Sequence, residues 1–581
     1  MSRGRRNPRH NGGVGMDIGT AMGFLAIGVV AGSVLSAQVG AWVQHRVTGS
    51  APPSSNPFMT FGEFLGGHRT WSMTATVVVA SAWLMVAVVG GTVWWALRRW
   101  RQPATRVDAA AKYLADSSDV QSLSRGNAEA DAKKWLPHPE LAKSHPGLRF
   151  GKVPGTRTGL YSTWEDLYLV IFGPRMGKTT SQVIPAIVDA PGNVVTTSNK
   201  RDIIDDTIAV TAGRGEVWVF DPQRIASGFN QSPWFFDPLD MIRREADMMD
   251  AAALRLADIF KTAARGHDSG GDAYFSDGGR DLLSRFMLAA ALDNRPIGDV
   301  YVWVNDDSDR TSVRILNAYP EWSQQATALA ATYTITEKTR SGLFSQAAQM
   351  ATPLGRRETL KWVTPAEGHR RFDAASFVRG QQDTVYILSK EGADNAAALT
   401  TALTAAITTA AEQYGEQCGG RLPVPLVAAL DEAANVVKWP ELPSLYSHYG
   451  SRGIILMTIL QSYTQGVGVW GEEGMEAMWS AASILLYGGG VRDDKMLQKL
   501  ESLIGEVEVF ESSTSRTGDG PRSVSTQRRE KKILTVSELA SLQQWRALVL
   551  ASKRRPMVAE MEPFWVRPWP ERIRAQLGVT A

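Results

Sequence analysis

The sequence contains almost no cysteine. Cys418 is the single cysteine among 581 residues, so no disulfide can form within the chain. This excludes a small secreted domain stapled by disulfides and fits a chain whose bulk lies in the cytoplasm. The eight histidines are scattered through the sequence, and no metal-ligand cluster is visible.

A large excess of one charge is also missing. The 62 lysines and arginines nearly balance the 59 aspartates and glutamates, which leaves a net charge of +3. Any contact with nucleic acid or lipid must therefore come from local basic patches and not from a global field. A hydrophobic content of 44% and a charged content of 21% indicate a globular protein with apolar additions, long enough for about three or four domains.

Two long segments, residues 21–43 and 73–97, contain no charged residue. Each would form a helix of roughly 35 Å, which exceeds the ~30 Å hydrocarbon layer of a membrane. Small residues suit close helix contact in lipid, and tryptophans near the second end suit an interfacial belt. We therefore expect a two-span membrane anchor over residues 21–97. The small residues are Gly28, Ala31, Gly32, Ser33, Gly90 and Gly91, and the tryptophans are Trp94, Trp95 and Trp100.

Basic residues predict the orientation of this anchor. Arginines cluster on both outer sides of the two spans, whereas the connecting loop of about 29 residues has only Arg46 and Arg69. Both termini should be cytoplasmic in a multi-pass protein of the cell membrane, with residues 1–20 as a basic tail. A cleaved signal peptide, or two buried core helices, are the alternatives. The flanking arginines are Arg3, Arg5, Arg6 and Arg9 before the first span and Arg98, Arg99, Arg101 and Arg106 after the second.

Residues 171–181, IFGPRMGKTTS, are close to the phosphate-binding pattern G-x-x-x-x-G-K-[ST]. Phe172 stands where the first glycine of that pattern should be. The loop still offers backbone N–H groups, an ammonium for the β- and γ-phosphates of ATP and a hydroxyl for Mg²⁺. An ordinary glycine turn is the alternative. The predicted nucleotide-binding residues are Gly173, Pro174, Arg175, Met176, Gly177, Lys178, Thr179 and Thr180, with Thr179 also a metal ligand.

The surroundings of the loop strengthen this interpretation. An apolar strand at 167–172 precedes the loop and a helix at 179–190 follows it, with a shallow kink expected at Pro185. Further strands are expected at 193–198 and 216–220. The order strand, glycine loop, helix, strand is typical of a nucleotide-binding α/β fold.

A pair of carboxylates lies far downstream. Residues 425–436, PLVAALDEAANV, form an apolar strand that ends at Asp431 and Glu432. Asp431 would hold Mg²⁺ through water, and Glu432 would act as the general base on the attacking water. The alternative is a helix N-terminus capped by Asp431.

The next strand, 453–461, supplies two more candidates for catalysis. Gln461 at its end would sense the γ-phosphate, or would only make a strand-end hydrogen bond. Arg452 before it could reach the nucleotide of a neighbouring subunit and stabilise transition-state charge, or be a solvated arginine. The predicted catalytic residues are thus Glu432, Gln461 and Arg452.

The periodicity of apolar residues changes between 239 and 372, where helical patterns replace strands. We expect an inserted all-α domain there, with Trp303, Trp322 and Trp362 in its core. Residues 156–238 and 373–581 would form the nucleotide-binding domain around it, with late strands at 383–389 and 483–490 and an edge strand at 547–556. Residues 98–155 read as a linker packed against this domain.

One late segment, residues 511–534, is basic and rich in serine, threonine and glycine. It could be a mobile loop that touches nucleic-acid phosphates at a pore. A solvated hairpin is the alternative.

These features together resemble a known family. Two N-terminal spans, a split phosphate-loop domain, LDEAANV followed by SRGIILMTILQSYTQ, FDP at 220–222 and GGGVRDDKML at 488–497 are similar to the type IV secretion coupling proteins. These are conjugative DNA-transfer ATPases of the TraG and TraD kind. The resemblance covers roughly residues 165–555 and the layout of the membrane anchor.

The resemblance implies a RecA-like motor, often a homo-hexameric ring in a lipid bilayer. Such a motor passes single-stranded DNA with a bound relaxase, or protein substrates, to the components of a type IV secretion channel. It also implies ATP and Mg²⁺ as cofactors, nucleotide and metal binding by Lys178 and Thr179, hydrolysis by Asp431 and Glu432, and phosphate sensing by Gln461. The missing first glycine and TSNK at 197–200, where many relatives have an acidic residue before the lysine, depart from the family and put the hydrolysis rate in question more than the fold.

Two other functions remain open at this point. A translocase of double-stranded DNA, of the kind that acts in chromosome or plasmid segregation, would usually carry a separate DNA-reading domain, and none is evident. A non-motor membrane scaffold would have a decayed nucleotide site.

Overall fold

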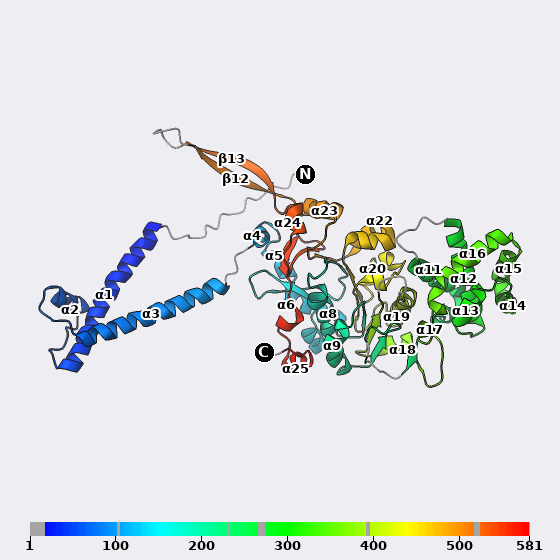
Figure 1. Ribbon diagram of the computed structural model, residues 1–581, viewed down its shortest axis with the longest axis horizontal. Coiled ribbons are helices and arrows are strands. Elements are labelled where there is room, and N and C mark those ends of the chain that lie inside the picture. Colours follow the sequence, from blue (N-terminus) through cyan, green and yellow to red (C-terminus); the bar gives the residue numbers. More distant parts are fainter. Residues whose placement is uncertain are drawn as a thin grey trace. The chain divides into compact units, whose positions relative to one another are not determined.

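The computed structural model divides the chain into two compact units, Met1–Ala104 and Thr105–Ala581 (Figure 1). It describes residues 18–100, 105–226, 228, 233–264, 273–390, 396–515 and 523–579. Five of the arginines used to predict the membrane orientation, Arg3, Arg5, Arg6, Arg9 and Arg101, lie outside the described residues.

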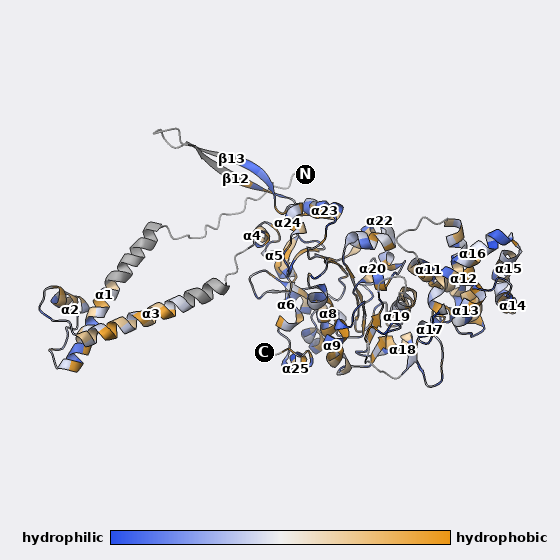
Figure 2. Cartoon of the chain, in the orientation of Figure 1, coloured by the Kyte–Doolittle hydropathy of each residue, from blue (hydrophilic) through white to orange (hydrophobic). Residues whose placement is uncertain are grey.

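The first unit consists of three helices, α1 (Ile18–Thr48), α2 (Pro57–Leu65) and α3 (Met73–Trp100). Both predicted spans are helical. Within the described residues, one helical stretch, Met73–Thr92 of α3, is long and apolar enough to cross a membrane. Figure 2 shows the hydrophobic character of this helix.

Two tryptophans join α1 to α3: Trp71, just before α3, and Trp83, within α3. A Cβ built on Gly32 would lie 2.6 Å from the ring of Trp83, and one on Gly40 would lie 2.5 Å from the ring of Trp71. The Trp83 Nε1–H donates a hydrogen bond to Ser36 Oγ at 2.9 Å. Small residues four positions apart thus let the helices approach, as in lipid-embedded helix pairs.

The close approach predicted at the two glycines of the second span is not seen among the described residues and stays a prediction. No described atom outside their own helix turn lies within 4 Å of a Cβ built on Gly90 or Gly91. The contact with α1 is made instead through Trp71 and Trp83, because the large indole rings span the gap between the helices.

The second unit is built on an 11-stranded sheet in the order β2-β1-β15-β14-β11-β3-β10-β9-β4-β8-β5. The run from β11 to β5 is parallel, and its strands are buried along almost their whole length. Such burial on both faces explains their continuous apolar sequences. These strands are β3 (Tyr168–Ile171), β4 (Val194–Ser198), β5 (Val217–Phe220), β8 (Thr384–Leu388), β9 (Leu426–Leu430), β10 (Ile454–Leu460) and β11 (Ile484–Tyr487).

The other end of the sheet is antiparallel. Strand β14 (Arg546–Ala551) pairs with β11 and with β15 (Met557–Glu560), and β1 (Arg149–Lys152) and β2 (Gly159–Tyr161) follow. The predicted edge position of the strand at 547–556 is therefore wrong, because β15 folds back on β14. Strand β1 lies within the range predicted as a linker.

Helices from that same range pack on the antiparallel strands. Arg546 Nε donates to Asp108 Oδ1 at 2.7 Å, and Arg555 Nε donates to Asp119 Oδ2 at 3.0 Å. These contacts fasten residues 105–155 to the sheet. The helices are α4 (Arg106–Ala110), α5 (Ser117–Ser122), α6 (Arg125–Trp135) and α7 (Pro139–Ser144).

The sheet is flanked by helices from the rest of the unit. They are α8 (Ile184–Asp189), α9 (Asp202–Ala212), α18 (Ala374–Arg379), α19 (Ala397–Gln417), α20 (Ala433–Val436), α21 (Leu442–Leu445), α22 (Tyr463–Ala481), α23 (Asp494–Ile504), α24 (Val536–Ala540) and α25 (Glu571–Gln576).

The segment between β5 and β8 is a block of helices, as its periodicity indicates. Its two stems pair as the short parallel strands β6 (Trp234–Phe235) and β7 (Arg370–Arg371). Trp362 packs at this neck, with ring centroids 5.4 Å from Phe220 and 5.5 Å from Trp234, while Trp303 is buried inside the block. The helices are α10 (Asp240–Arg243), α11 (Met249–Ala264), α12 (Ala273–Leu292), α13 (Gly298–Val304), α14 (Thr311–Asn317), α15 (Ser323–Thr334), α16 (Glu337–Met350) and α17 (Arg357–Leu360).

Two long strands, β12 (Glu506–Ser515) and β13 (Ser523–Lys532), form a separate antiparallel hairpin. The hairpin accounts for most of the basic segment 511–534 (Figure 1). Its turn, residues 516–522, lies outside the described residues.

Replacing Asp108 with alanine tests whether the helices before β1 stabilise the sheet. The side chains of Asp108 and Arg546 are each 15% exposed, so Asp108→Ala removes the nearer carboxylate from a mostly buried guanidinium and leaves Glu560 Oε2 at 4.0 Å. We expect a loss of about 1–3 kcal/mol in unfolding free energy, read as a lower melting temperature of the detergent-solubilised chain. Asp247→Ala, at an exposed position of the helical block, is the control. Equal melting temperatures for both variants would contradict the expectation.

Candidate nucleotide site

The topology brings three chain segments to one edge of the sheet. The glycine loop follows β3, the acidic pair follows β9, and Gln461 follows β10. Because β10 lies between β3 and β9 and all three are parallel, their carboxyl ends meet. This edge is where ligands bind in open α/β sheets.

The glycine loop departs from the usual pattern for a packing reason. A Cβ built on Gly173 would lie 2.2 Å from the carbonyl oxygen of Gly490, and the Gly173 N–H donates to Gly489 O at 2.9 Å. Only glycine fits at 173. The ring of Phe172 is buried and lies 2.3 Å from a Cβ built on Gly488. The glycine run after β11 thus makes room for Phe172 beside the loop.

The tip of the loop uses left-handed backbone. Arg175 has φ 62° and Gly177 has φ 87°, a region that glycine enters without steric cost. Gln544 Nε2 donates to Arg175 O at 3.1 Å, and the ring of Trp545 lies 2.5 Å from a Cβ built on Gly177. The chain just before β14 therefore covers the loop. Pro174 is exposed and Met176 half-buried, and Thr180 Oγ1 donates to Gly177 O at 3.2 Å.

The helix after the loop begins as a π-helix over Thr179–Val183 and continues as α8. The Ile184 N–H donates to Thr179 O, five residues back. Pro185 has no N–H to donate. The wider π-helical turn immediately precedes it, near the position where a shallow kink was expected.

The centre of the site is one ammonium between two carboxylates. Lys178 Nζ contacts Glu432 Oε1 and lies 3.3 Å from Asp431 Oδ1, while Thr179 Oγ1 donates to Asp431 Oδ2 at 2.9 Å. Burial raises the pKa of Asp431 although Lys178 opposes the shift. Burial also lowers the pKa of Lys178, but the two carboxylates outweigh it and the net shift is upward. Lys178 therefore remains an ammonium.

Gln461 completes this centre. Its Nε2 donates to both carboxylate oxygens of Glu432, at 2.7 and 2.8 Å. Glu432 has φ 53° and ψ 40°, a left-handed conformation that costs free energy for a residue with a side chain. Strain of this kind is found most often where function requires a fixed side chain.

The motifs did not indicate three further polar residues around the centre. Asn435 Nδ2 donates to Glu432 Oε2 at 3.5 Å, and Gln465 Nε2 donates to Asn435 Oδ1 at 3.0 Å. Thr197 Oγ1 donates to Asp431 O at 2.8 Å. The spacing of Asn435 three residues after Glu432, on one helical turn, was the available signal.

Arg452 is not brought to this site. Its Nη1 lies 2.8 Å from Glu412 Oε1 and 2.9 Å from Glu416 Oε1. It precedes β10, whereas Gln461 follows β10, so the two residues lie at opposite edges of the sheet. Within one chain, Arg452 is separated from the other predicted catalytic residues.

The oxygen donors at the centre fit Mg²⁺. The ion prefers oxygen ligands and keeps several waters, so one hydroxyl and one carboxylate suffice when phosphate oxygens supply the rest. Thr179 Oγ1 and Asp431 Oδ2 already adjoin each other. No group of three or more His, Cys, Asp or Glu residues able to hold a metal occurs in the part of the chain that the structure describes.

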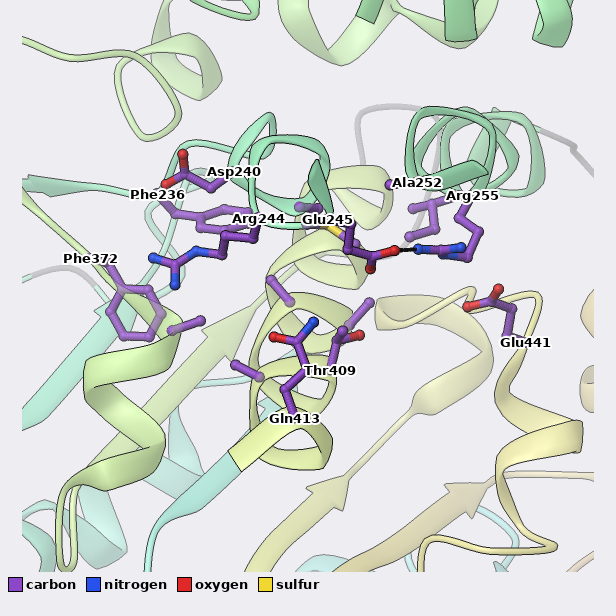
Figure 3. A pocket seen from close by; sticks show the side chains of 16 residues that line it. Phe236, Asp240, Arg244, Glu245, Ala252, Arg255, Phe372, Thr409, Gln413 and Glu441 are labelled. Atoms are coloured by element: carbon purple, nitrogen blue, oxygen red, sulfur yellow. Dashed lines mark hydrogen bonds and ion pairs between the residues drawn. The ribbon is translucent and has the colours of Figure 1, made fainter. Parts of the chain in front are cut away.

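A separate cavity of about 40 Å³ lies where α10 and α11 meet α19 (Figure 3). Arg244, Glu245, Arg255 and Glu441 line it, and an ion pair joins Arg255 to Glu245. Burial raises the pKa of Glu441 against the opposing effect of Arg255. The cavity has room for a few water molecules and not for a nucleotide.

Comparison with protein families gives a match over residues 425–544, to the family described as "TraM recognition site of TraD and TraG". The resemblance to the type IV secretion coupling proteins is confirmed. The matched segment contains the acidic pair, Gln461 and the β12–β13 hairpin. Among curated proteins, none matches the sequence with significance.

Solved structures show the same fold. The plasmid coupling protein TrwB in complex with ADP and Mg²⁺ is 17% identical, with a TM-score of 0.51 over 70% of this chain and 87% of that chain. The unbound conjugative coupling protein TrwB is 18% identical, with a TM-score of 0.49 over 69% and 85%. By its match to the TrwB complex with ADP and Mg²⁺, the second unit has a TrwB-like α/β fold with a large mixed sheet, in agreement with the α/β part of the predicted fold class.

Restoring the first glycine of the usual pattern tests the packing at Phe172. Phe172→Gly removes a buried ring that fills the space beside Gly488, so we expect a loss of about 3–5 kcal/mol in unfolding free energy. Thermal unfolding of the purified chain measures it. Phe172→Leu, which keeps most of the volume, should cost clearly less. An unchanged or raised melting temperature for Phe172→Gly would contradict the expectation.

Proposed function

We propose that this protein is a membrane-anchored ATPase of the coupling-protein type. It uses ATP and Mg²⁺ to pass single-stranded DNA with a bound relaxase, or a protein substrate, to a type IV secretion channel. The observation that carries this proposal is the convergence of Lys178, Thr179, Asp431 and Glu432 with Gln461 at one sheet edge. The TrwB likeness with ADP and Mg²⁺ supports it further.

Each residue of the centre has a role in this mechanism. Lys178 exchanges its carboxylate partners for the β- and γ-phosphates, and Thr179 and Asp431 would hold Mg²⁺, which would neutralise charge on the phosphates. Glu432, released from Lys178, polarises the attacking water as general base. Gln461 orients Glu432 and reports the presence of the γ-phosphate, while Asn435, itself held by Gln465, donates to the same carboxylate.

The anchor proposed for this function has two membrane spans, α1 and α3, with both termini in the cytoplasm. Their contact through Gly32, Ser36 and Trp83 suits a pair of helices in lipid. A homo-hexameric ring, which the family resemblance implies, would give the transferred strand a central path.

Lys178→Ala tests the motor role. Loss of the Lys178 ammonium should lower ATP turnover by at least about 100-fold, a typical effect of removing a transition-state donor. Turnover is measured on the detergent-solubilised chain, with Lys495→Ala, an exposed lysine of α23, as the matched control. Chelation of Mg²⁺ should abolish turnover in both. A Lys178→Ala protein that still supports DNA or protein transfer would indicate a scaffold instead.

The choice of nucleic acid is tested with single-stranded and duplex oligonucleotides of equal length. We expect single strands to be retained more strongly on filters and to stimulate ATP turnover by the purified chain. Stronger retention of duplex would favour a double-stranded DNA translocase. If neither oligonucleotide stimulates turnover, protein export becomes the supported function and DNA transfer is contradicted.

A further inference from the structure

Two tryptophans emerge at the sheet edge that carries the glycine loop. Trp545 immediately precedes β14, which runs antiparallel to β11 and pairs Leu548 with Tyr487 near the end of that strand. Strand β15 then returns, with Glu560 opposite Arg546, and Trp565 follows five residues after its end. The pairing therefore places both tryptophans beside the carboxyl ends of β11 and β3.

The position of the acidic pair gives a nucleotide in this site a direction. Glu432 and Gln461 follow β9 and β10, on one side of β3, so the γ-phosphate end must face that side. Strands β11 and β14 lie on the other side of β3. A triphosphate held along the loop from Gly173 to Lys178 therefore directs its nucleoside toward β11 and β14.

Trp545 is fixed against the loop in an unusual backbone conformation. Its φ is 67°, which is rare for a bulky residue and costs free energy. Hydrogen bonds to its carbonyl oxygen from Met561 N at 3.0 Å and from Arg546 Nη1 at 3.3 Å hold the conformation. The ring lies so close to Gly177 that no side chain would fit there.

Trp565 extends this aromatic surface toward solvent. Its ring centroid is 6.2 Å from that of Trp545, at an interplanar angle of 86°, and the residue is 46% exposed. An indole face that stays accessible beside a phosphate loop can stack on a planar base. Stacking of a base on an aromatic ring tolerates different bases because each has a π-face.

We propose that Trp545 and Trp565 form the surface on which the base of the bound nucleotide stacks. The proposal rests on the nucleotide site of the proposed function and adds the element that recognises the nucleoside. Trp545 covers the glycine loop and holds Trp565 in place beside it, and Trp565 offers the accessible ring.

The experiment compares ATP with inorganic tripolyphosphate, both with Mg²⁺, in equilibrium binding to the detergent-solubilised full chain. Tripolyphosphate has the same phosphates and no base. The native chain should bind ATP more tightly than tripolyphosphate. Trp565→Ala should weaken ATP binding by about 5-fold or more, the lower end of base stacking on an aromatic ring, and leave tripolyphosphate binding unchanged. Trp565→Phe should retain most of the ATP affinity.

Controls keep the possible outcomes separate. Trp322→Ala, which replaces a half-buried tryptophan of the helical block, should change neither affinity. If Trp565→Ala lowers the melting temperature, Trp545→Phe is measured in its place. Failure of the native chain to bind either ligand would contradict the nucleotide site itself. Equal affinities for ATP and tripolyphosphate, or equal losses for both in Trp565→Ala, would overturn the base-stacking proposal alone. So would a variant that loses single-stranded oligonucleotide binding but keeps its ATP affinity.

Discussion

The site depends on one buried ammonium, Lys178, between the carboxylates of Asp431 and Glu432. Two adjacent buried carboxylates repel each other and lose hydration, so a cation must neutralise them. The loop after β3 supplies that cation, and this contact ties β3 to β9 across the intervening β10. One ammonium faces two carboxylates in the closed centre, so a net negative charge remains there, and phosphate binding must exchange one set of ionic contacts for another.

The polar residues around this centre act as a support for one side chain. Glu432 receives hydrogen bonds from Gln461 and Asn435, and Gln465 links Asn435 to the backbone N–H of Gln461. A carboxylate held from several directions stays oriented when its lysine partner leaves. Gln465 lies at the start of α22, so the helix that follows β10 also helps to hold the Glu432 carboxylate through Asn435.

Much of this arrangement could be predicted because it depends on short, continuous stretches of sequence. Apolar runs followed by glycines or carboxylates mark β3, β9 and β10, and their motifs indicate the chemistry of Lys178 and Asp431. Non-local pairing could not be predicted in the same way. The internal position of β14 depends on β15 and β1, and the contact of Gln465 with Asn435 exists only once β9 and β10 are neighbours. Arg452 precedes β10, so within one chain it lies at the opposite edge from Gln461, and its predicted contact with the nucleotide of a neighbouring subunit stays a prediction.

The contact of Phe172 with Gly488 couples two positions that are 316 residues apart in sequence number. A larger residue at 488 would collide with the ring, and a smaller one at 172 would leave a void. A change of side-chain size at either position alone is therefore expected to be unfavourable, and a change at both together is expected to be tolerated better. The size of the side chain at 172 and the absence of one at 488 therefore constrain each other.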